Sequence, residues 1–218
     1  MTAKDSTLET IRRVGIIPVI RAPDTDAAIA IVEALADAVL TIAEVTMTVP
    51  DAISAIGTIA KRFGDRVLVG AGTVTDAETA KRSIDAGARF VVSPCLVPPV
   101  VHAATRAGVA VLPGALTPTE IFEAHKLGAD MVKVFPAANV GGASYLRALR
   151  GPFPGIPLVP TGGVTLDNIR DMFDAGAVAV GVGSEMISRD ALSRKDYRAI
   201  AGLAMQFLVA AREARAKH

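Results

Sequence analysis

One lysine of this chain stands in a strand-like run of apolar residues. Lys133 lies between Val132 and Val134, whereas the other lysines lie in polar termini, helical patterns or helix ends. An ammonium group is costly to bury unless it is paired or gives up its proton. A lysine without that proton is a nucleophile. This stretch alone is equally consistent with a catalytic nucleophile and with a structural ion pair.

A carboxylate and a guanidinium group occur in two other apolar runs. Glu44 is the only acidic residue inside an apolar strand pattern. A carboxylate there can transfer protons if its surroundings move its pKa toward neutrality, or it can be a counter-ion without a chemical role. Arg21 ends the first run and suits bidentate recognition of a carboxylate or a phosphate. Its alternative is a solvated arginine at the rim of the site.

Two glycine-rich turns follow the last apolar runs. They read Thr161-Gly162-Gly163-Val164 and Gly181-Val182-Gly183-Ser184. Glycine amides and a helix N-terminus in such turns can bind a phosphate, although the glycines can also serve only to make tight turns. Gly70-Ala71-Gly72 resembles half of a dinucleotide-binding fingerprint, but Thr75 stands where its third glycine belongs. We therefore reject a dinucleotide site.

These residues sit in a unit that recurs along the chain: a short apolar run, a loop, then a helical pattern that often ends in glycine. The strands are predicted at residues 16–20, 40–46, 67–69, 90–92, 110–112, 131–135, 157–159 and 178–182. The helices are predicted at residues 6–13, 25–38, 51–63, 76–86, 98–107, 118–127, 141–149, 166–175 and 197–214. Strands that alternate with helices at this spacing form parallel βαβ units.

Eight such units predict an α/β fold, a (β/α)8 TIM barrel with a short N-terminal helix, as a single domain over residues 1–218. A doubly wound sheet is the alternative, but no glycine fingerprint follows the first strand. In a barrel the C-terminal ends of the strands form the active site. Its mouth would then gather the charged groups, hydroxyls and glycines at these ends: Arg21, Glu44, Thr46, Thr48, Gly72, Thr73, Ser93, Pro94, Gly114, Lys133, Thr161, Gly162, Gly163, Gly183 and Ser184.

Composition excludes several classes of function. The chain of 218 residues is 51% hydrophobic and 21% charged, which is typical of a packed globular protein. Its net charge is +1, without a long basic run, so we expect no nucleic-acid partner. Its single cysteine, Cys95, excludes an intramolecular disulfide and indicates a reducing compartment. No apolar stretch is long enough to cross a membrane, so we expect no membrane partner and a cytoplasmic location.

The sequence does not predict a metal site. His102 and His125 fall in helical patterns away from the strand ends, and His218 is terminal. Cys95 has no second cysteine or nearby histidine to share a zinc ion with. Its place after Pro94 favours a small loop residue over a catalytic thiol.

Together, the motifs resemble the 2-keto-3-deoxy-6-phosphogluconate (KDPG) aldolase and 4-hydroxy-2-oxoglutarate (KHG) aldolase family. Each motif is weak alone, but their order and spacing are specific and run through nearly the whole chain. The motifs are Glu44-Val45-Thr46, Gly70-Ala71-Gly72-Thr73-Val74, Ser93-Pro94, Pro113-Gly114, Lys133-Val134-Phe135-Pro136-Ala137, Gly151-Pro152-Phe153, Pro160-Thr161-Gly162-Gly163-Val164 and Gly183-Ser184.

This resemblance implies a class I aldolase without a metal or other cofactor, on a trimeric barrel. Lys133 would form a Schiff base with pyruvate, and Glu44 would be the general acid/base. The implied substrates are KDPG or its galacto epimer, split into pyruvate and glyceraldehyde 3-phosphate, and 4-hydroxy-2-oxoglutarate, split into pyruvate and glyoxylate. Two alternatives remain: a phosphate-binding TIM-barrel isomerase or synthase, which has no need of a lysine in a central strand, and a non-catalytic binding module.

The resemblance also assigns the substrate contacts. Thr73 and Thr161 would hold the pyruvyl end of the substrate. The phosphate would be bound by both glycine-rich turns, through Gly162, Gly163, Gly183 and Ser184. Phe135 and Pro94 would line the pocket. Thr48 is also expected in the substrate-binding site, but it departs from the pattern, because many members have at this position an arginine that binds the substrate carboxylate. Arg21 is expected to supply that guanidinium, as in relatives that act on the 6-phosphogalactonate epimer.

Overall fold

The computed structural model describes residues 1–216, and within them strands and helices alternate as predicted. All strand pairs are parallel. The strands are β1 (Ile16–Ile20), β2 (Ile42–Thr46), β3 (Leu68–Gly72), β4 (Phe90–Val92), β5 (Ala110–Leu112), β6 (Gly114–Ala115), β7 (Val132–Val134), β8 (Leu158–Pro160) and β9 (Val180–Val182). The parallel α/β class predicted from the alternation is therefore confirmed.

The strands form two sheets, and the three strands of the smaller sheet lie in the sequence between β5 and β9 of the larger one. The larger has the order β5-β4-β3-β2-β1-β9, and the smaller has the order β6-β7-β8. The fifth predicted strand differs from the prediction, because Pro113 separates β5 from the two-residue strand β6. Proline has no N–H to donate to a ladder, which explains the break. A single bridge between Thr161 and Gly181 joins the end of β8 to β9.

The α-helices are α1 (Ala3–Val14), α2 (Thr25–Asp37), α3 (Ala52–Phe63), α4 (Ala77–Asp85), α5 (Pro98–Arg106), α6 (Pro118–Lys126), α7 (Ala143–Arg150), α8 (Ile169–Asp174), α9 (Arg189–Ser193) and α10 (Tyr197–Arg215). Short 3-10 turns lie at η1 (Gly64–Arg66) and η2 (Ala138–Val140). Helix α9 was not predicted. The first helix begins earlier than predicted, because Thr2 and Asp5 form a capping box that satisfies its first amides.

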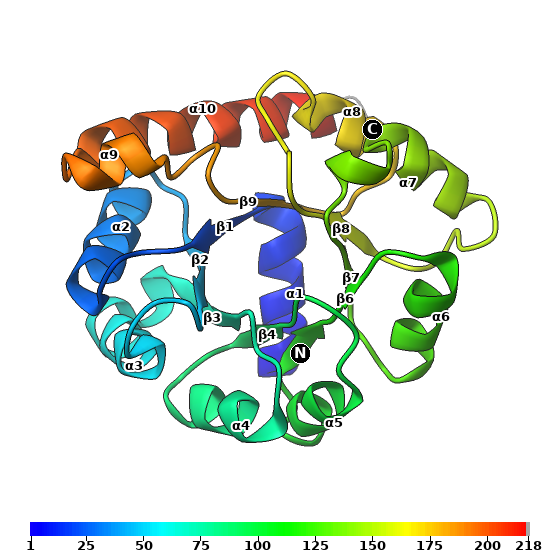
Figure 1. Cartoon of the computed structure of the whole chain (residues 1–218), viewed down its shortest axis with the longest axis horizontal. Helices are drawn as coiled ribbons and strands as arrows, with labels where there is room; N and C mark the ends of the chain where they lie inside the picture. Colours follow the sequence, from blue (N-terminus) through cyan, green and yellow to red (C-terminus); the bar gives the residue numbers. More distant parts are fainter. Residues whose placement is uncertain (217–218) are drawn as a thin grey trace.

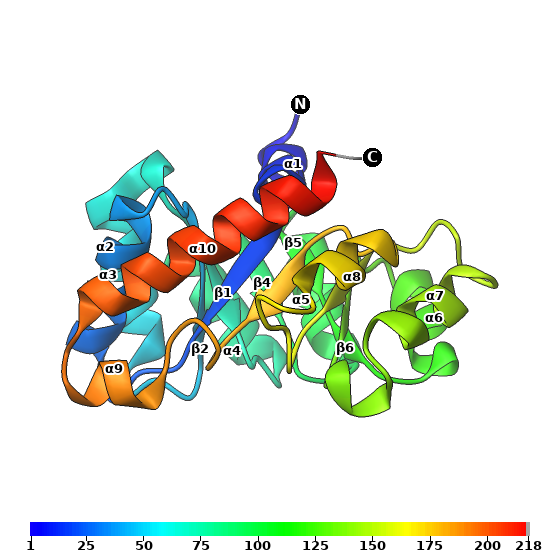
Figure 2. The same cartoon turned by 90° about the horizontal axis from the view of Figure 1, so that it is seen from above.

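Helices surround the strands, and α1 marks the end of the molecule opposite the predicted site. Figure 1 shows the strands in the middle of the molecule with α2 to α10 around them. Seen from above, α1 lies at the end where the strands begin, and α9 lies at the opposite end (Figure 2). The strand termini that carry the predicted site residues are therefore at the α9 end. No helix within residues 1–216 is long and apolar enough to cross a membrane.

Candidate active site

Lys133 lies in the middle of β7 and is only 4% exposed. Its strand neighbours are Gly114 on β6 and Val159 on β8. Residues two apart in a strand point to the same side, so the side chain of Phe135 lies beside that of Lys133. The Lys133 Nζ atom is 5.0 Å from the centroid of the Phe135 ring. The buried amine therefore faces an aromatic surface.

Glu44 lies on β2 and is 2% exposed. Burial raises the pKa of its carboxyl group, and the positive charges of Lys133 and Arg21 oppose that rise. Its Oε1 atom is buried without a hydrogen-bond partner in the described part of the chain. A buried carboxyl whose pKa is raised can hold a proton at a pH where an exposed glutamate cannot, which a general acid/base requires.

The two groups are near enough to interact electrostatically, but they are not an ion pair in this structure. No carboxylate within residues 1–216 lies within 4.0 Å of the Lys133 amine, and the Glu44 carboxylate has no such cationic partner. A structural salt bridge was the alternative role for both residues. The observed geometry does not provide that salt bridge.

Arg21 and Thr48 meet beside Glu44 at the ends of β1 and β2. The Nη1 group of Arg21 donates a hydrogen bond to Thr48 Oγ1 over 3.2 Å. Thr48 Oγ1 lies 2.6 Å from Thr46 Oγ1, and Thr46 in turn donates to the carbonyl oxygen of Ile20 over 2.8 Å. Thr46 is fully buried, whereas Arg21 and Thr48 are exposed. The sequence predicted Thr46 at the mouth of the barrel but assigned it no function. The one signal in the sequence was its spacing of two residues from both Glu44 and Thr48, which in an extended chain places the three side chains on the same side.

Two further threonines occupy unusual positions. Thr73 follows β3 and is half-buried, and its φ of 58° lies in the left-handed region that β-branched residues rarely adopt. Strained conformations of this kind cluster at functional sites. Thr161 follows β8, is 7% exposed and bridges to Gly181. A side chain on Gly181 would overlap the Thr161 hydroxyl, so that glycine makes room for Thr161.

The predicted phosphate turns lie at the ends of β8 and β9. Gly162 and Gly163 have φ angles of 88° and 75°, which only glycine adopts without strain. A Cβ on Gly162 would press on the Phe135 ring, so this turn also sets the position of that ring. At the second turn Gly183 is half-buried, and Ser184 is exposed to solvent.

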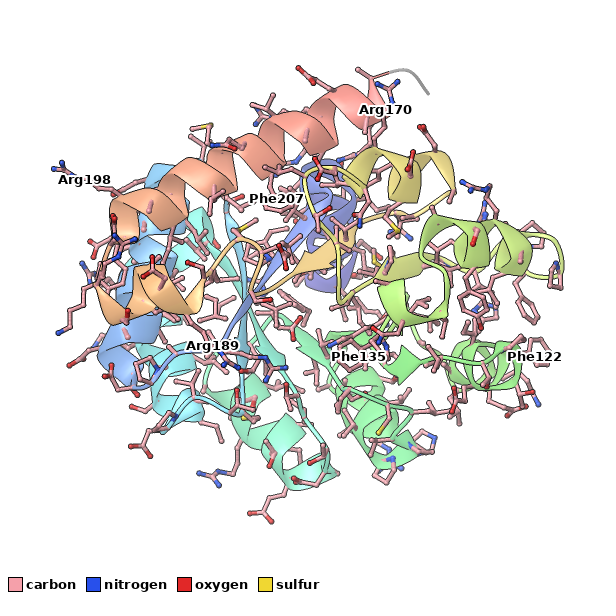
Figure 3. The ribbon with its side chains drawn as sticks, turned by 45° about the horizontal axis from the view of Figure 1, so that its top comes forward. Phe122, Phe135, Arg170, Arg189, Arg198 and Phe207 are labelled. Atoms are coloured by element: carbon pink, nitrogen blue, oxygen red, sulfur yellow. The ribbon has the colours of Figure 1, made fainter. Side chains whose placement is uncertain are left out.

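Pro94 follows β4 and is half-buried, with its backbone packed against Gly114, where any side chain would overlap it. Figure 3 shows Phe135 near the centre of the molecule and Arg189, the first residue of α9, to the left of it. The charges of Arg21 at the end of β1 and of Lys133 on β7 thus both act on Glu44 of β2, and β8 lies next to β7. A cavity of about 940 Å³ lies elsewhere, lined by residues of α1, α3 and α10, and includes none of the predicted site residues.

Metal ligands do not gather in the described part of the chain. No group of three His, Cys, Asp or Glu side chains within residues 1–216 is arranged to hold a metal ion. Cys95 is a free and exposed thiol. His218, which the sequence placed at the end of the chain, lies outside the described residues.

Comparison with known proteins identifies the family. Residues 8–203 match the aldolase family described as "KDPG and KHG aldolase". The chain belongs to this family. The resemblance inferred from the motifs is therefore confirmed. The members of the family that this chain matches are named as aldolases, which are lyases.

Two curated members of the aldolase family illustrate the similarity. The 2-dehydro-3-deoxy-phosphogluconate aldolase of Treponema pallidum is 36% identical over 200 residues, which are 92% of this chain and 95% of that protein. The 2-dehydro-3-deoxy-6-phosphogalactonate aldolase of Escherichia coli is 33% identical over 175 residues, which are 80% of this chain and 85% of that protein. Relatives named for both epimers thus match this chain at similar identity.

One solved structure of the aldolase family bears on the chemistry. KDPG aldolase from Legionella pneumophila superimposes with a TM-score of 0.84 at 30% identity, covering 91% of this chain and 96% of that chain. That structure holds pyruvate captured at low pH as a covalent carbinolamine intermediate. A carbinolamine forms when an amine adds to the carbonyl carbon of pyruvate, which is the first step of Schiff-base formation.

Proposed function

We propose that this chain is a class I aldolase that cleaves KDPG or its galacto epimer into pyruvate and glyceraldehyde 3-phosphate. The observation that carries the proposal is that Lys133, which is buried without an ion-pair partner among residues 1–216, acts electrostatically on Glu44, whose pKa burial raises. The names of the two curated relatives and the covalent pyruvate adduct of the Legionella protein support the same reaction. Cleavage of 4-hydroxy-2-oxoglutarate into pyruvate and glyoxylate is a second proposed activity, from the family name.

In the proposed mechanism the free amine of Lys133 attacks the 2-oxo carbon of the substrate. Glu44, directly or through a water, protonates the departing hydroxyl as the carbinolamine loses water and becomes an iminium ion. The Glu44 carboxylate then takes the proton of the C4 hydroxyl while the iminium accepts the electron pair of the C3–C4 bond, so the aldehyde leaves and an enamine of pyruvate remains. Glu44 returns a proton to the enamine carbon, and water then releases pyruvate from Lys133.

The substrate contacts are proposed from the positions of the side chains. Arg21 would bind the carboxylate, because a guanidinium group offers two parallel donors. Thr73 and Thr161 would hold the pyruvyl group beside Lys133. The far phosphate would bind at Gly162, Gly163, Gly183 and Ser184, and Pro94 and Phe135 would form the apolar walls. No metal or other cofactor takes part in this proposal.

We also propose that the two sheets close into one (β/α)8 barrel, with residues 1–218 as a single domain. Two kinds of contact support the closure. The N–H of Lys133 donates to the carbonyl of Pro113 over 3.0 Å, which ties β7 to the β5–β6 strand. The bridge from Thr161 to Gly181 ties β8 to β9. By family membership we further propose a cytoplasmic homotrimer, whose mass light scattering on the full chain would measure.

Reductive trapping tests the proposed chemistry. The protein is incubated with pyruvate and sodium borohydride, and the intact mass is measured. We expect a stable mass increase that matches reduced pyruvate and that disappears in Lys133→Ala and Lys133→Arg. An adduct that persists in Lys133→Ala, or no adduct in the unmodified protein, would refute the Schiff base. A phosphate-binding isomerase or synthase, the alternative function, would form no such adduct.

Retro-aldol rates on a panel of 2-keto-3-deoxy acids test the substrate. The panel holds the gluconate and galactonate epimers, each with and without the 6-phosphate. We expect both phosphorylated acids to be cleaved faster than their unphosphorylated forms, because the glycine turns are proposed to bind the phosphate. Equal cleavage rates with and without the 6-phosphate would show that Gly162, Gly163 and Ser184 do not bind the substrate phosphate.

A further inference from the structure

Three polar side chains form one chain of hydrogen bonds at the ends of β1 and β2. It runs from Arg21 Nη1 to Thr48 Oγ1 over 3.2 Å, from Thr48 to Thr46 over 2.6 Å, and from Thr46 to the carbonyl oxygen of Ile20 over 2.8 Å. The inner end is anchored on buried strand backbone, since Thr46 is 0% exposed and β1 pairs with β2 at this level. The outer end is the guanidinium group of an exposed arginine.

The direction of each bond follows from the number of available protons. A threonine hydroxyl has one proton to donate and two lone pairs that accept. The Ile20 carbonyl can only accept, so it takes the proton of Thr46. The contact between the two hydroxyls then requires Thr48 to donate to Thr46. The remaining lone pairs of Thr48 face Arg21, and a guanidinium group can only donate.

This order leaves Thr48 without a proton for any other acceptor. A substrate carboxylate carries only acceptors, so it cannot bind Thr48 unless the chain breaks. The carboxylate can still bind Arg21. Only one N–H group of the guanidinium donates to Thr48, and the other N–H groups do not donate to a carboxylate of the described residues. No acidic side chain within residues 1–216 lies within 4.0 Å of the Arg21 nitrogens.

We propose that Thr46 and Thr48 are positioning residues that hold the guanidinium group of Arg21 in the orientation that receives the carboxylate of the 2-oxo acid. Thr48 acts through Arg21 and does not touch the substrate. A long arginine side chain at a solvent-exposed rim has many rotamers, and fixing it before binding reduces the entropy lost when the substrate binds. This inference rests on the proposed function, in which Arg21 binds that carboxylate.

A double-mutant cycle tests whether Thr48 acts through Arg21. The variants are Thr48→Val, Thr48→Ser, Arg21→Ala and the double variant Arg21→Ala/Thr48→Val, and the measured quantities are the kcat and KM of retro-aldol cleavage. We expect Thr48→Val to raise KM roughly three- to tenfold with kcat nearly unchanged, because the chain contributes to binding only. Thr48→Ser keeps the hydroxyl and should restore the KM of the unmodified protein.

The decisive comparison is made in the Arg21→Ala background. If Thr48 acts through Arg21, adding Thr48→Val there should change KM less than twofold. The same three- to tenfold increase of KM in both backgrounds would show that Thr48 contacts the substrate by itself. An unchanged KM in the single variant Thr48→Val would show that Thr48 neither contacts the substrate nor acts through Arg21. Either result overturns the inference.

Two controls separate this result from folding and from the proposed function. Thr48 is exposed, so thermal unfolding of Thr48→Val should match that of the unmodified protein. Thr46→Ser keeps the buried hydroxyl and should retain the unmodified KM, whereas Thr46→Val should raise it as Thr48→Val does. Borohydride trapping of pyruvate on the unmodified protein tests the aldolase itself: no adduct overturns both proposals, while an adduct together with an additive cycle overturns only this one.

Discussion

The carboxylate of Glu44 occupies the space that a side chain on Gly72 would need. A Cβ built on Gly72 would overlap the Glu44 Oε1 atom and press on the rest of its carboxyl group. The two residues lie on neighbouring strands, since Glu44 pairs with Gly70 and Thr46 pairs with Gly72. The glycine at the end of β3 is therefore part of what places the proposed acid/base.

The first prediction concerns this pair. Gly72→Ala should lower the turnover number at least tenfold, because the added methyl group forces Glu44 to move and small displacements of a catalytic group are costly. The matched control is Gly57→Ala in α3, whose added Cβ would meet only ordinary contacts and which should leave turnover unchanged. Steady-state kinetics with circular dichroism checks both. A Gly72→Ala variant with normal turnover would show that Glu44 can move without loss.

The second prediction concerns stability against pH. Burial raises the pKa of Glu44 above its ordinary value of 4.5, so between these two values the folded chain keeps a proton that the unfolded chain loses. The free energy of unfolding should therefore fall as pH rises through this window, by up to about 1.4 kcal/mol per pH unit. Glu44→Gln cannot titrate and should lack this part of the slope.

Urea denaturation of both proteins at a series of pH values measures the difference. Glu44→Gln should gain stability relative to the unmodified protein as pH rises from 4.5 toward the raised pKa. Parallel stability curves across that range would mean that burial does not raise the pKa of Glu44. The same variant should fold but turn over far more slowly, and normal turnover would leave Glu44 with a structural role only.

The third prediction concerns the aromatic ring beside the lysine. The centroid of the Phe135 ring lies 5.0 Å from Lys133 Nζ, where the positive charge of an iminium ion would form. Phe135→Leu keeps an apolar wall but removes the ring, so the rate of pyruvate adduct formation should fall roughly five- to thirtyfold. Phe135→Tyr should retain most of the rate.

Phe153→Leu is the matched control for this variant. Phe153 stacks on Phe122 with ring centroids 5.8 Å apart, and neither residue belongs to the proposed site. Its loss should affect stability but not the trapping rate. Equal trapping rates in Phe135→Leu and the unmodified protein would show that the ring only fills space.

The fourth prediction concerns the attachment of α1. Asp130 accepts a hydrogen bond from the N–H of Val111 over 2.9 Å and lies 2.7 Å from Lys4 Nζ, with both charged side chains mostly buried. Asp130→Ala leaves the Val111 amide unpaired and should lower the free energy of unfolding by about 1–3 kcal/mol. Lys4→Ala should cost about 1 kcal/mol or less.

Urea denaturation measures these losses, and Asp130→Asn separates the two contacts because it keeps the acceptor for Val111 and removes the charge. Asp130→Asn should therefore resemble Lys4→Ala. Turnover should not change in any of the three, because α1 lies at the end of the molecule opposite α9 (Figure 2). An Asp130→Ala variant no less stable than Lys4→Ala would show that the bond to Val111 contributes little.

The alternation of strands and helices and the outline of the proposed site could be predicted from the sequence because they depend on local signals. Apolar runs define the strands, and the glycines after α4, α5, α6 and α8 have the positive φ angles that end a helix. Lys133 and Glu44 stood out because a charge in an apolar strand is rare. The parallel order of the strands then implied that their C-terminal ends share one side.

Contacts between strands were decided only by the tertiary structure. The fit of Glu44 over Gly72, the room that Gly181 leaves for Thr161, and the hydroxyl chain from Thr46 to Arg21 each join residues far apart in sequence. Such contacts depend on the register between strands and on side-chain rotamers, and neither is encoded in a local pattern. The sequence by itself therefore determined which residues are proposed to carry the chemistry, and the packing of neighbouring strands decided how each one is held.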